Sequence, residues 1–175
     1  MNWFSVSDGD PTARELFNRH YSRHFYKDGR RPKLFVGPGQ KMVLMTTDGL
    51  ALFVWRKFIS GDGQAGVNCA IFRNEGNLLS SDLILEAEQL AWGRWPGERL
   101  YTYINSKKIK SSNPGYCFKK AGWRICGTTK VNKLIILEKL SEEESLTIHN
   151  EIYIATRTRT RLAAAAAQPL LPGVG

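Results

Sequence analysis

Short runs of apolar and polar residues follow one another along the first 140 positions, and clusters of Gly, Pro, Asn and Asp separate them. Alternating runs predict strands at residues 2–6, 41–46, 50–58, 67–72, 99–105, 123–126 and 133–139. Runs with helical spacing predict helices at residues 13–24, 82–92 and 113–121. Strands and helices therefore mix along the chain in the order β-α-β-β-β-α-β-α, followed by a closing pair of strands, which predicts an α/β (α+β) domain with a mixed sheet.

The first predicted helix carries two histidines on one face. Asp10 and Pro11 provide an acidic cap and a first-turn proline ahead of it. His20 and His24 are four residues apart, and this spacing lets two imidazoles face one metal ion. The alternative is a pair of structural or exposed histidines.

The character of the chain changes at about Ser141. Three glutamates at 142–144 are followed by a Thr-Arg repeat at 156–161, five alanines and an end rich in Pro and Gly. We therefore expect a catalytic domain over residues 1–140 and a charged, then low-complexity, tail over 141–175, whose last 15 to 20 residues lack fixed structure.

Length and composition favour one globular domain. A chain of 175 residues with 42% hydrophobic residues can bury a core of its own. No apolar run approaches the roughly 18 residues that span a bilayer, and no leader precedes the first strand, so we expect a cytoplasmic protein that makes no membrane contact. The three cysteines form no CxxC pair and predict buried thiols.

The net charge of +9 is concentrated in two segments. Residues 99–137 hold nine basic residues and no acidic one, and residues 14–41 hold eight basic and two acidic residues. Such a distribution favours a polyanionic partner, either DNA or a phosphorylated cofactor, over a merely soluble basic surface. The candidate nucleic-acid contacts are Arg23, Lys27, Arg30, Arg31, Lys107, Lys108 and Lys110.

A candidate anion site lies where the strand at 67–72 leads into a helix. The connecting loop contains Arg73, Asn74, Gly76 and Asn77, and Ser80 and Ser81 can cap the helix that follows. Free backbone N–H groups at a helix start, beside a basic residue and a glycine, suit a phosphate. A plain turn is the alternative.

These residues, together with a second motif, resemble the GNAT acyltransferase superfamily. Residues 73–76, Arg-Asn-Glu-Gly, match the first half of its phosphate-loop motif, and residues 120–123, Lys-Ala-Gly-Trp, match the end of its later short helix. The resemblance covers roughly residues 2–140 and implies a single domain with a central mixed sheet flanked by helices. It also implies acetyl-CoA or another acyl-CoA, held by Arg73, Asn74, Gly76, Asn77, Ser80, Ser81, Asn113 and Lys119.

Two positions depart from the superfamily pattern. Leu78 replaces the second glycine of the loop, and Phe118 stands where a tyrosine commonly protonates the departing thiolate. Tyr116 or Cys117 can donate that proton instead, or can simply pack. Glu86 or Glu88 on the preceding helix can act as a general base, or belong to a solvated face.

Together with the histidine and tyrosine at 20 and 21, these motifs resemble phage DNA-modification proteins of the Mom type. That resemblance implies transfer of an acyl-type group to adenine in DNA, with His20 and Tyr21 as catalytic residues or as ligands of iron. Two alternatives stay open. One is a conventional acetyl-CoA-dependent N-acetyltransferase that acts on a small amine or a protein. The other is a non-catalytic DNA-binding domain with this fold.

Overall fold

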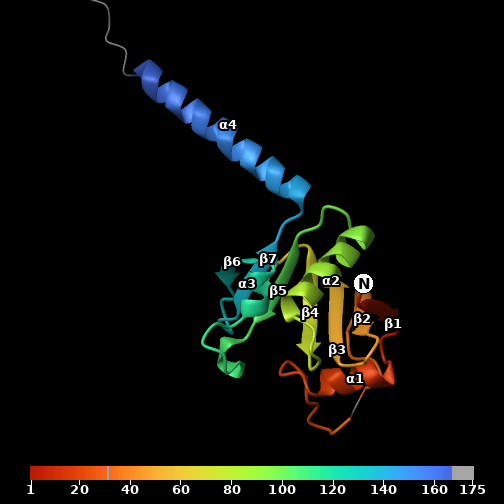
Figure 1. The fold of residues 1–175 in the computed structure, drawn as a ribbon. Coiled ribbons are helices and arrows are strands. Elements are labelled where there is room, and N and C mark those ends of the chain that lie inside the picture. The colour runs from red at the N-terminus through yellow and green to blue at the C-terminus, as the bar shows by residue number, and fades with distance from the viewer. Residues whose placement is uncertain (31, 167–175) are drawn as a thin grey trace, which may run out of the picture. The chain divides into compact units, whose positions relative to one another are not determined.

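The computed structural model describes residues 1–30 and 32–166, and these fall into two compact units that divide after Leu140. In the first unit, seven strands form one mixed sheet in the order β1-β2-β3-β4-β5-β7-β6 (Figure 1). The strands are β1 (Trp3–Val6), β2 (Gln40–Thr46), β3 (Ala51–Lys57), β4 (Val67–Asn74), β5 (Leu100–Ile104), β6 (Arg124–Thr128) and β7 (Ile135–Lys139). The neighbours β4 and β5 are parallel, and every other pair is antiparallel. The prediction of a mixed sheet flanked by helices is confirmed.

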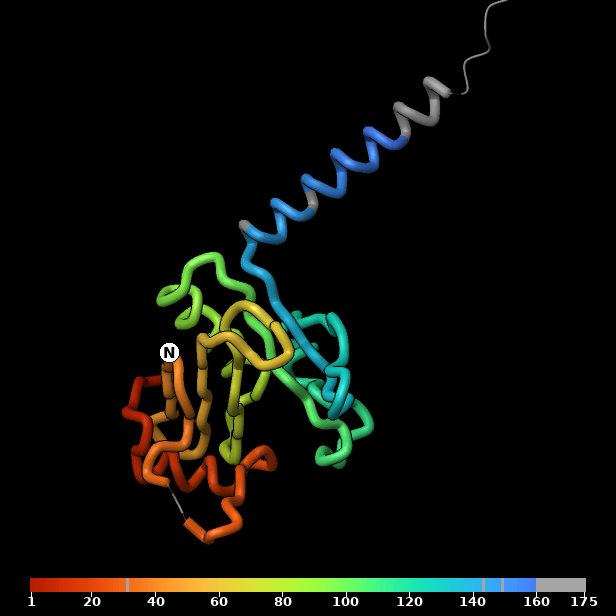
Figure 2. The backbone as a smooth tube through the Cα atoms, turned by 180° about the vertical axis from the view of Figure 1, so that it is seen from behind, coloured from red at the N-terminus to blue at the C-terminus, as the bar shows by residue number. Residues whose placement is uncertain are grey.

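The helices of the first unit lie between these strands in sequence. They are α1 (Pro11–Asn18), α2 (Ser80–Arg94), the 3-10 turn η1 (Ser106–Lys108) and α3 (Tyr116–Lys120). Seen from behind, the chain between α1 and β2 runs along one end of the sheet (Figure 2).

The second unit contains helix α4 (Glu142–Ala166). We expected part of this segment to lack fixed structure, but residues 156–166 belong to α4. The rest of that expectation concerns residues 167–175, which lie outside the described residues. No helix in the described part of the chain is both long and apolar enough to cross a membrane.

Both faces of the sheet are covered by apolar side chains, because successive strand residues point to opposite faces. In β3, Phe53 and Trp55 belong to the same core cluster as the buried residues of α2 and α3. Leu52 and Val54 belong to a second cluster with Leu16 of α1. The indole N–H of Trp55 donates to the Ala87 carbonyl of α2 at 2.9 Å, which fixes this helix against the strand.

Helix α1 is shorter than the periodicity predicts. It ends at Asn18, and Arg19 is its C-cap. The carbonyl of Arg19 accepts a hydrogen bond from the guanidinium of Arg73 in β4 at 2.7 Å. This carbonyl therefore bonds to a side chain rather than to the backbone N–H of a further helical turn. His20 and His24 are therefore not on a helix, and the prediction of two imidazoles on one helical face is wrong.

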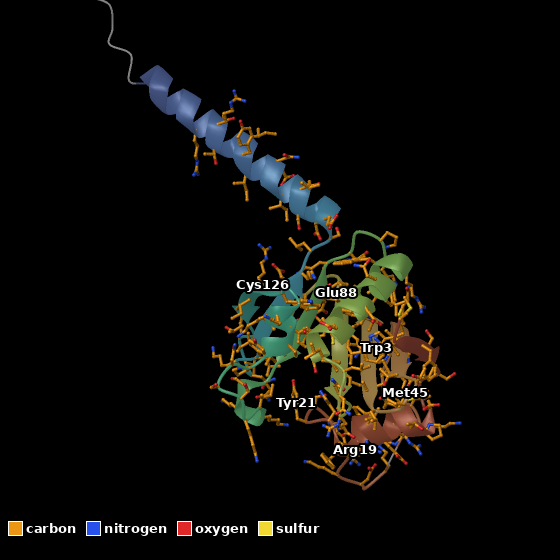
Figure 3. The ribbon with its side chains drawn as sticks, viewed as in Figure 1. Trp3, Arg19, Tyr21, Met45, Glu88 and Cys126 are labelled. Carbon is orange, nitrogen blue, oxygen red and sulfur yellow. The ribbon has the colours of Figure 1, made fainter. Side chains whose placement is uncertain are left out.

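A buried carboxylate joins α2 to β7. Glu88 is fully buried and accepts hydrogen bonds from the indole of Trp123 and, at 2.6 Å, from the ammonium of Lys139 (Figure 3). Burial raises the pKa of Glu88, while Lys139 and Trp123 act in the opposite direction. Glu88 therefore holds the structure together, rather than belonging to a solvated face.

Removing this carboxylate would leave Lys139 and the Trp123 N–H without their partner. We expect Glu88→Ala to lower the free energy of unfolding by about 3 kcal/mol. The matched variant Glu98→Ala breaks the ion pair between Glu98 and Lys57, whose side chains are each about one-third exposed. We expect it to lower the free energy of unfolding by about 1 kcal/mol or less. Urea unfolding of both variants measures the difference, and equal losses would contradict the assigned role of Glu88.

Candidate functional site

The parallel strands β4 and β5 pair only at their first three positions. Val67, Asn68 and Cys69 face Leu100, Tyr101 and Thr102, and no pairing follows. In the ladder between β3 and β4 the register shifts beside Cys69, and Ala70 is left without a partner, which marks a β-bulge. Beyond this bulge the two strands separate, so one edge of β4 carries backbone N–H and C=O groups without a neighbouring strand.

A cavity of about 670 Å³ occupies the space between the separating strands. We call it the wedge cavity. Its walls come from β4, β5, the residues around η1 and α3, and the segment that follows α1. At its narrow end the Thr102 hydroxyl donates to the Cys69 carbonyl at 2.9 Å. Sequence reasoning missed both residues, since nothing in an apolar strand pattern marks the point where two strands separate.

Tyr21 contributes a hydroxyl to the wedge cavity. It lines the cavity, and its side chain lies near the end of β4 (Figure 3). Burial is the main cause that raises the pKa of the Tyr21 phenol. A hydrogen bond from the backbone of Asn105 lowers this pKa, and the neighbouring thiols of Cys69 and Cys117 raise it. Tyr21 is therefore a neutral proton donor at physiological pH.

His20 lines the same cavity, and its ring is held by hydrogen bonds within the protein. Nδ1 lies 2.7 Å from the Ser22 hydroxyl and accepts from the Ser22 N–H, and the ring also hydrogen-bonds to the backbone of Phe72. Burial, with the positive charge of Arg73, lowers the pKa of His20 to about 4. The imidazole is therefore neutral, and its ring lies 4.4 Å from that of Tyr21.

The structure does not bring together ligands for a metal ion. Among the described residues, no group of three or more His, Cys, Asp or Glu side chains is placed to hold one. His24 lies away from His20, in contact with the Tyr26 ring and beside a different cavity. The donor set that iron would require is not assembled around His20 and Tyr21.

Side chains hold the loop between β4 and α2 in shape. Glu75 accepts hydrogen bonds from the guanidinium groups of Arg19 and Arg73, which lower its pKa to about 2. Asn74 donates to the Leu78 carbonyl and accepts from the Gly76 N–H. Arg73 and Asn74 are thus already engaged within the protein.

The start of α2 is not capped by a serine. Its N-cap is Leu79, which makes no side-chain hydrogen bond. Ser80 is the first helical residue, and its hydroxyl accepts from Asn74, while Ser81 contacts its neighbour Asp82. The prediction that Ser80 and Ser81 cap the helix is therefore wrong. The N–H groups of Ser80 and Ser81 have no partner within the helix, whereas the Asp82 N–H already donates to the Leu79 carbonyl.

The second motif forms one wall of the wedge cavity. Asn113, Tyr116 and Cys117 line it, and Lys119 donates to the Asn113 side chain at 2.6 Å. Phe118 is buried between Phe72 and Trp123, with ring centroids 5.8 and 4.9 Å away. Tyr116 is more than half exposed, so of the two tyrosines Tyr21 is the more enclosed.

Glu86 lies at a different place. Both of its carboxylate oxygens accept hydrogen bonds from Asn2, at 2.6 and 2.7 Å, which ties α2 to the start of β1. It does not line the wedge cavity. The structure therefore places Glu86 in a stabilising contact rather than beside Tyr21.

The predicted nucleic-acid contacts are divided between two cavities and exposed positions that line neither of them. Arg23 and Arg30 line a second cavity, Lys108 lines the wedge cavity, and Lys27, Lys107 and Lys110 are exposed and line neither. Arg31 lies outside the described residues.

Comparisons with known proteins identify the fold. No protein-family model matches the sequence, and no curated protein matches it. Among solved structures, the chain is similar to an acyl-CoA N-acyltransferase from Pseudomonas aeruginosa, with a TM-score of 0.51 and 15% identity over 79% of this chain and 99% of that chain. This likeness shows a GNAT-type fold, as the motifs at 73–76 and 120–123 implied, and it gives no support to the Mom-type subgroup.

The neutral state of His20 makes a testable contribution to stability. Its pKa is about 4 in the folded chain and about 6.5 when unfolded, so the folded state binds fewer protons between these values. The free energy of unfolding should fall as the pH drops through this window, by about 1.4 kcal/mol per pH unit from this one group. Urea unfolding of wild type and His20→Gln from pH 7 to pH 4 should show a steeper loss for wild type, whereas parallel losses would refute the assignment.

Proposed function

We propose that the unit Met1–Leu140 is an acyltransferase that takes its acyl group from an acyl-CoA bound in the wedge cavity. The single observation that carries this proposal is the separation of β4 and β5 after three residue pairs. The GNAT-type fold supports it, because the similar solved structure is described as an acyl-CoA N-acyltransferase.

The exposed edge of β4 fits the arm of coenzyme A. That arm is an extended chain with two amide groups, and it ends in the thiol that carries the acyl group. Backbone N–H and C=O groups beyond Ala70 have no strand beside them on this side, so an extended amide chain can supply hydrogen-bond partners there. Phe72, Ile104 and Phe118 provide apolar contact along the same walls.

The start of α2 suits the phosphate end of the donor. The uncapped first turn presents N–H groups with the positive end of the helix dipole. Gly76 has no side chain to obstruct a phosphate, although its N–H already donates to the Asn74 side chain, and Asn77 is exposed. We assign this end to Gly76, Asn77 and the backbone of Ser80 and Ser81, with Asn113 and Lys119 at α3.

Tyr21 is the proposed proton donor of the reaction. A nitrogen of the acceptor forms a bond to the thioester carbonyl carbon and loses a proton to solvent. The C–S bond breaks, the sulfur takes up a proton from an acid, and that acid regains its proton from solvent. Tyr21 is enclosed and protonated, so its hydroxyl can supply the proton to the sulfur. The raised pKa values of Cys69 and Cys117, caused by burial, keep both thiols protonated and unsuited to nucleophilic attack.

For the acceptor we propose a nucleobase in DNA, adenine in the first instance. The support is the concentration of basic residues in segments 14–41 and 99–137. Nucleoside mass spectrometry on plasmid DNA from an expressing host tests this proposal. A heavier deoxyadenosine supports it, and acyl transfer to small amines at a rate unaffected by DNA contradicts it.

Filling the wedge cavity should prevent donor binding. Cys117 is half-buried on its wall, so a tryptophan there would occupy the space of the donor. We expect Cys117→Trp to weaken acetyl-CoA binding by more than about tenfold in calorimetry, and the matched Cys117→Ala to retain it. Thermal unfolding of both variants controls for folding. Equal affinity in a folded Cys117→Trp variant would place the donor elsewhere.

Removing the Tyr21 hydroxyl should slow the reaction without loss of donor binding. We expect Tyr21→Phe to lower kcat about 100-fold while the Kd of acetyl-CoA stays constant. Release of coenzyme A, followed with a thiol reagent in the presence of acceptor, measures kcat. Tyr116→Phe is the matched control and should retain most activity. The reverse ranking of the two variants would make Tyr116 the donor.

A further inference from the structure

A second cavity of about 650 Å³ lies among α1, the chain that follows it, and the strands β2 and β3. We call it the basic pocket. Five of its lining side chains are cationic and one is acidic. The cationic residues are Arg14, Arg23, Arg30, Lys41 and Arg56, and the acidic residue is Asp8.

Three of these cations have no carboxylate partner. Among the described residues, ion pairs join Lys41 to Asp8 and Arg30 to Asp28, and none involves Arg14, Arg23 or Arg56. Each of the three is partly buried. Arg56 donates from Nε to the Pro38 carbonyl, so its two terminal nitrogens are not committed to that bond. Positive charge that is partly withdrawn from water and not compensated within the chain favours an anionic ligand.

The same pocket presents aromatic rings. Phe17 and Phe35 stack with their centroids 5.1 Å apart, and Tyr26 contacts His24 edge to face. The Arg30 guanidinium lies over the Tyr26 ring at 4.3 Å. Flat apolar surfaces beside guanidinium groups suit a planar heterocycle that carries a phosphate, because the ring can stack while the phosphate binds the cations.

The segment that follows α1 contributes residues to both cavities. His20, Tyr21 and Ser22 line the wedge cavity, whereas Asn18, Arg23 and His24 line the basic pocket. Six residues of the segment 18–24 thus line one cavity or the other. A ligand of the basic pocket that contacts Arg23 therefore touches a residue close in sequence to Tyr21, the proposed proton donor.

We propose that the basic pocket binds the acceptor of the reaction, and that this acceptor is a nucleoside phosphate, either free or within a nucleic-acid strand. The inference rests on the proposed function and deepens it by naming the site that holds the acceptor and the phosphate by which the acceptor is recognised. Arg14, Arg23 and Arg56 bind the phosphate, and the rings of Tyr26 and Phe35 contact the base.

Calorimetric titrations of the full chain with four probes test this inference. The probes are adenosine 5′-monophosphate, adenosine, a short single-stranded oligodeoxynucleotide and acetyl-CoA. The variant Arg14→Gln removes a charge that makes no ion pair, so it leaves the fold intact. Lys130→Gln is the control, because it removes an exposed positive charge from outside the basic pocket.

We expect the monophosphate to bind and adenosine to bind at least about tenfold more weakly. Arg14→Gln should weaken the monophosphate about tenfold and Lys130→Gln less than about twofold, while both leave acetyl-CoA binding unchanged. Tighter binding of the oligonucleotide with a steep salt dependence identifies a nucleic-acid strand as the source of the phosphate, and equal affinity identifies a free nucleotide.

Two results would overturn the inference in distinguishable ways. If acetyl-CoA binds but neither phosphate probe does, the acceptor site is refuted and the proposed acyltransferase activity is not. The same conclusion follows if Arg14→Gln leaves the affinity for the monophosphate unchanged. Binding of the monophosphate without any binding of acetyl-CoA would remove the proposed function, and the acceptor role with it.

Discussion

The separation of two parallel strands is the constraint on which the site depends. Backbone groups inside a protein need hydrogen-bond partners, and β4 and β5 satisfy one another only from Val67 to Cys69 and from Leu100 to Thr102. Gly66 makes the close approach at the narrow end possible, since a Cβ there would lie 2.3 Å from the Arg99 carbonyl oxygen. Beyond the bulge at Ala70 the strands diverge, and the polar edge that results is the proposed binding site of the donor.

Packing on one face of the sheet holds this separation open. Phe118 of α3 contacts Phe72 of β4 and Trp123, so an aromatic cluster supports the side of β4 that faces the cavity. Gly115 has a positive φ of 75° and lies against Leu137 of β7, which lets α3 approach the sheet closely. The cavity that remains has one cationic side chain, Lys108, in its walls, whereas the basic pocket has five. The two cavities thus suit chemically different ligands.

Local sequence signals predicted the framework better than the site. Alternating apolar residues placed each strand within about two residues of its observed bounds, because strand patterns report which face is buried. Helical spacing extended α1 too far, since it carries no information about the Arg73 side chain that binds the Arg19 carbonyl. The bulge at Ala70 and the pairing of Glu75 with two arginines depend on residues distant in sequence, and no short-range pattern reveals them. His20 and Tyr21 were found as candidates, but their shared cavity with Cys69 and Thr102 emerges only from the fold.

Hydrogen–deuterium exchange with and without coenzyme A is the most direct test of the central claim. The account predicts slower exchange at the amides of residues 70–74 in β4 and at the start of α2 near residues 78–81, because these groups gain partners from the ligand. It predicts little change in β1, which lies at the far edge of the sheet. Protection confined to residues 23–37, or unchanged exchange along β4 when the ligand is bound, would contradict it.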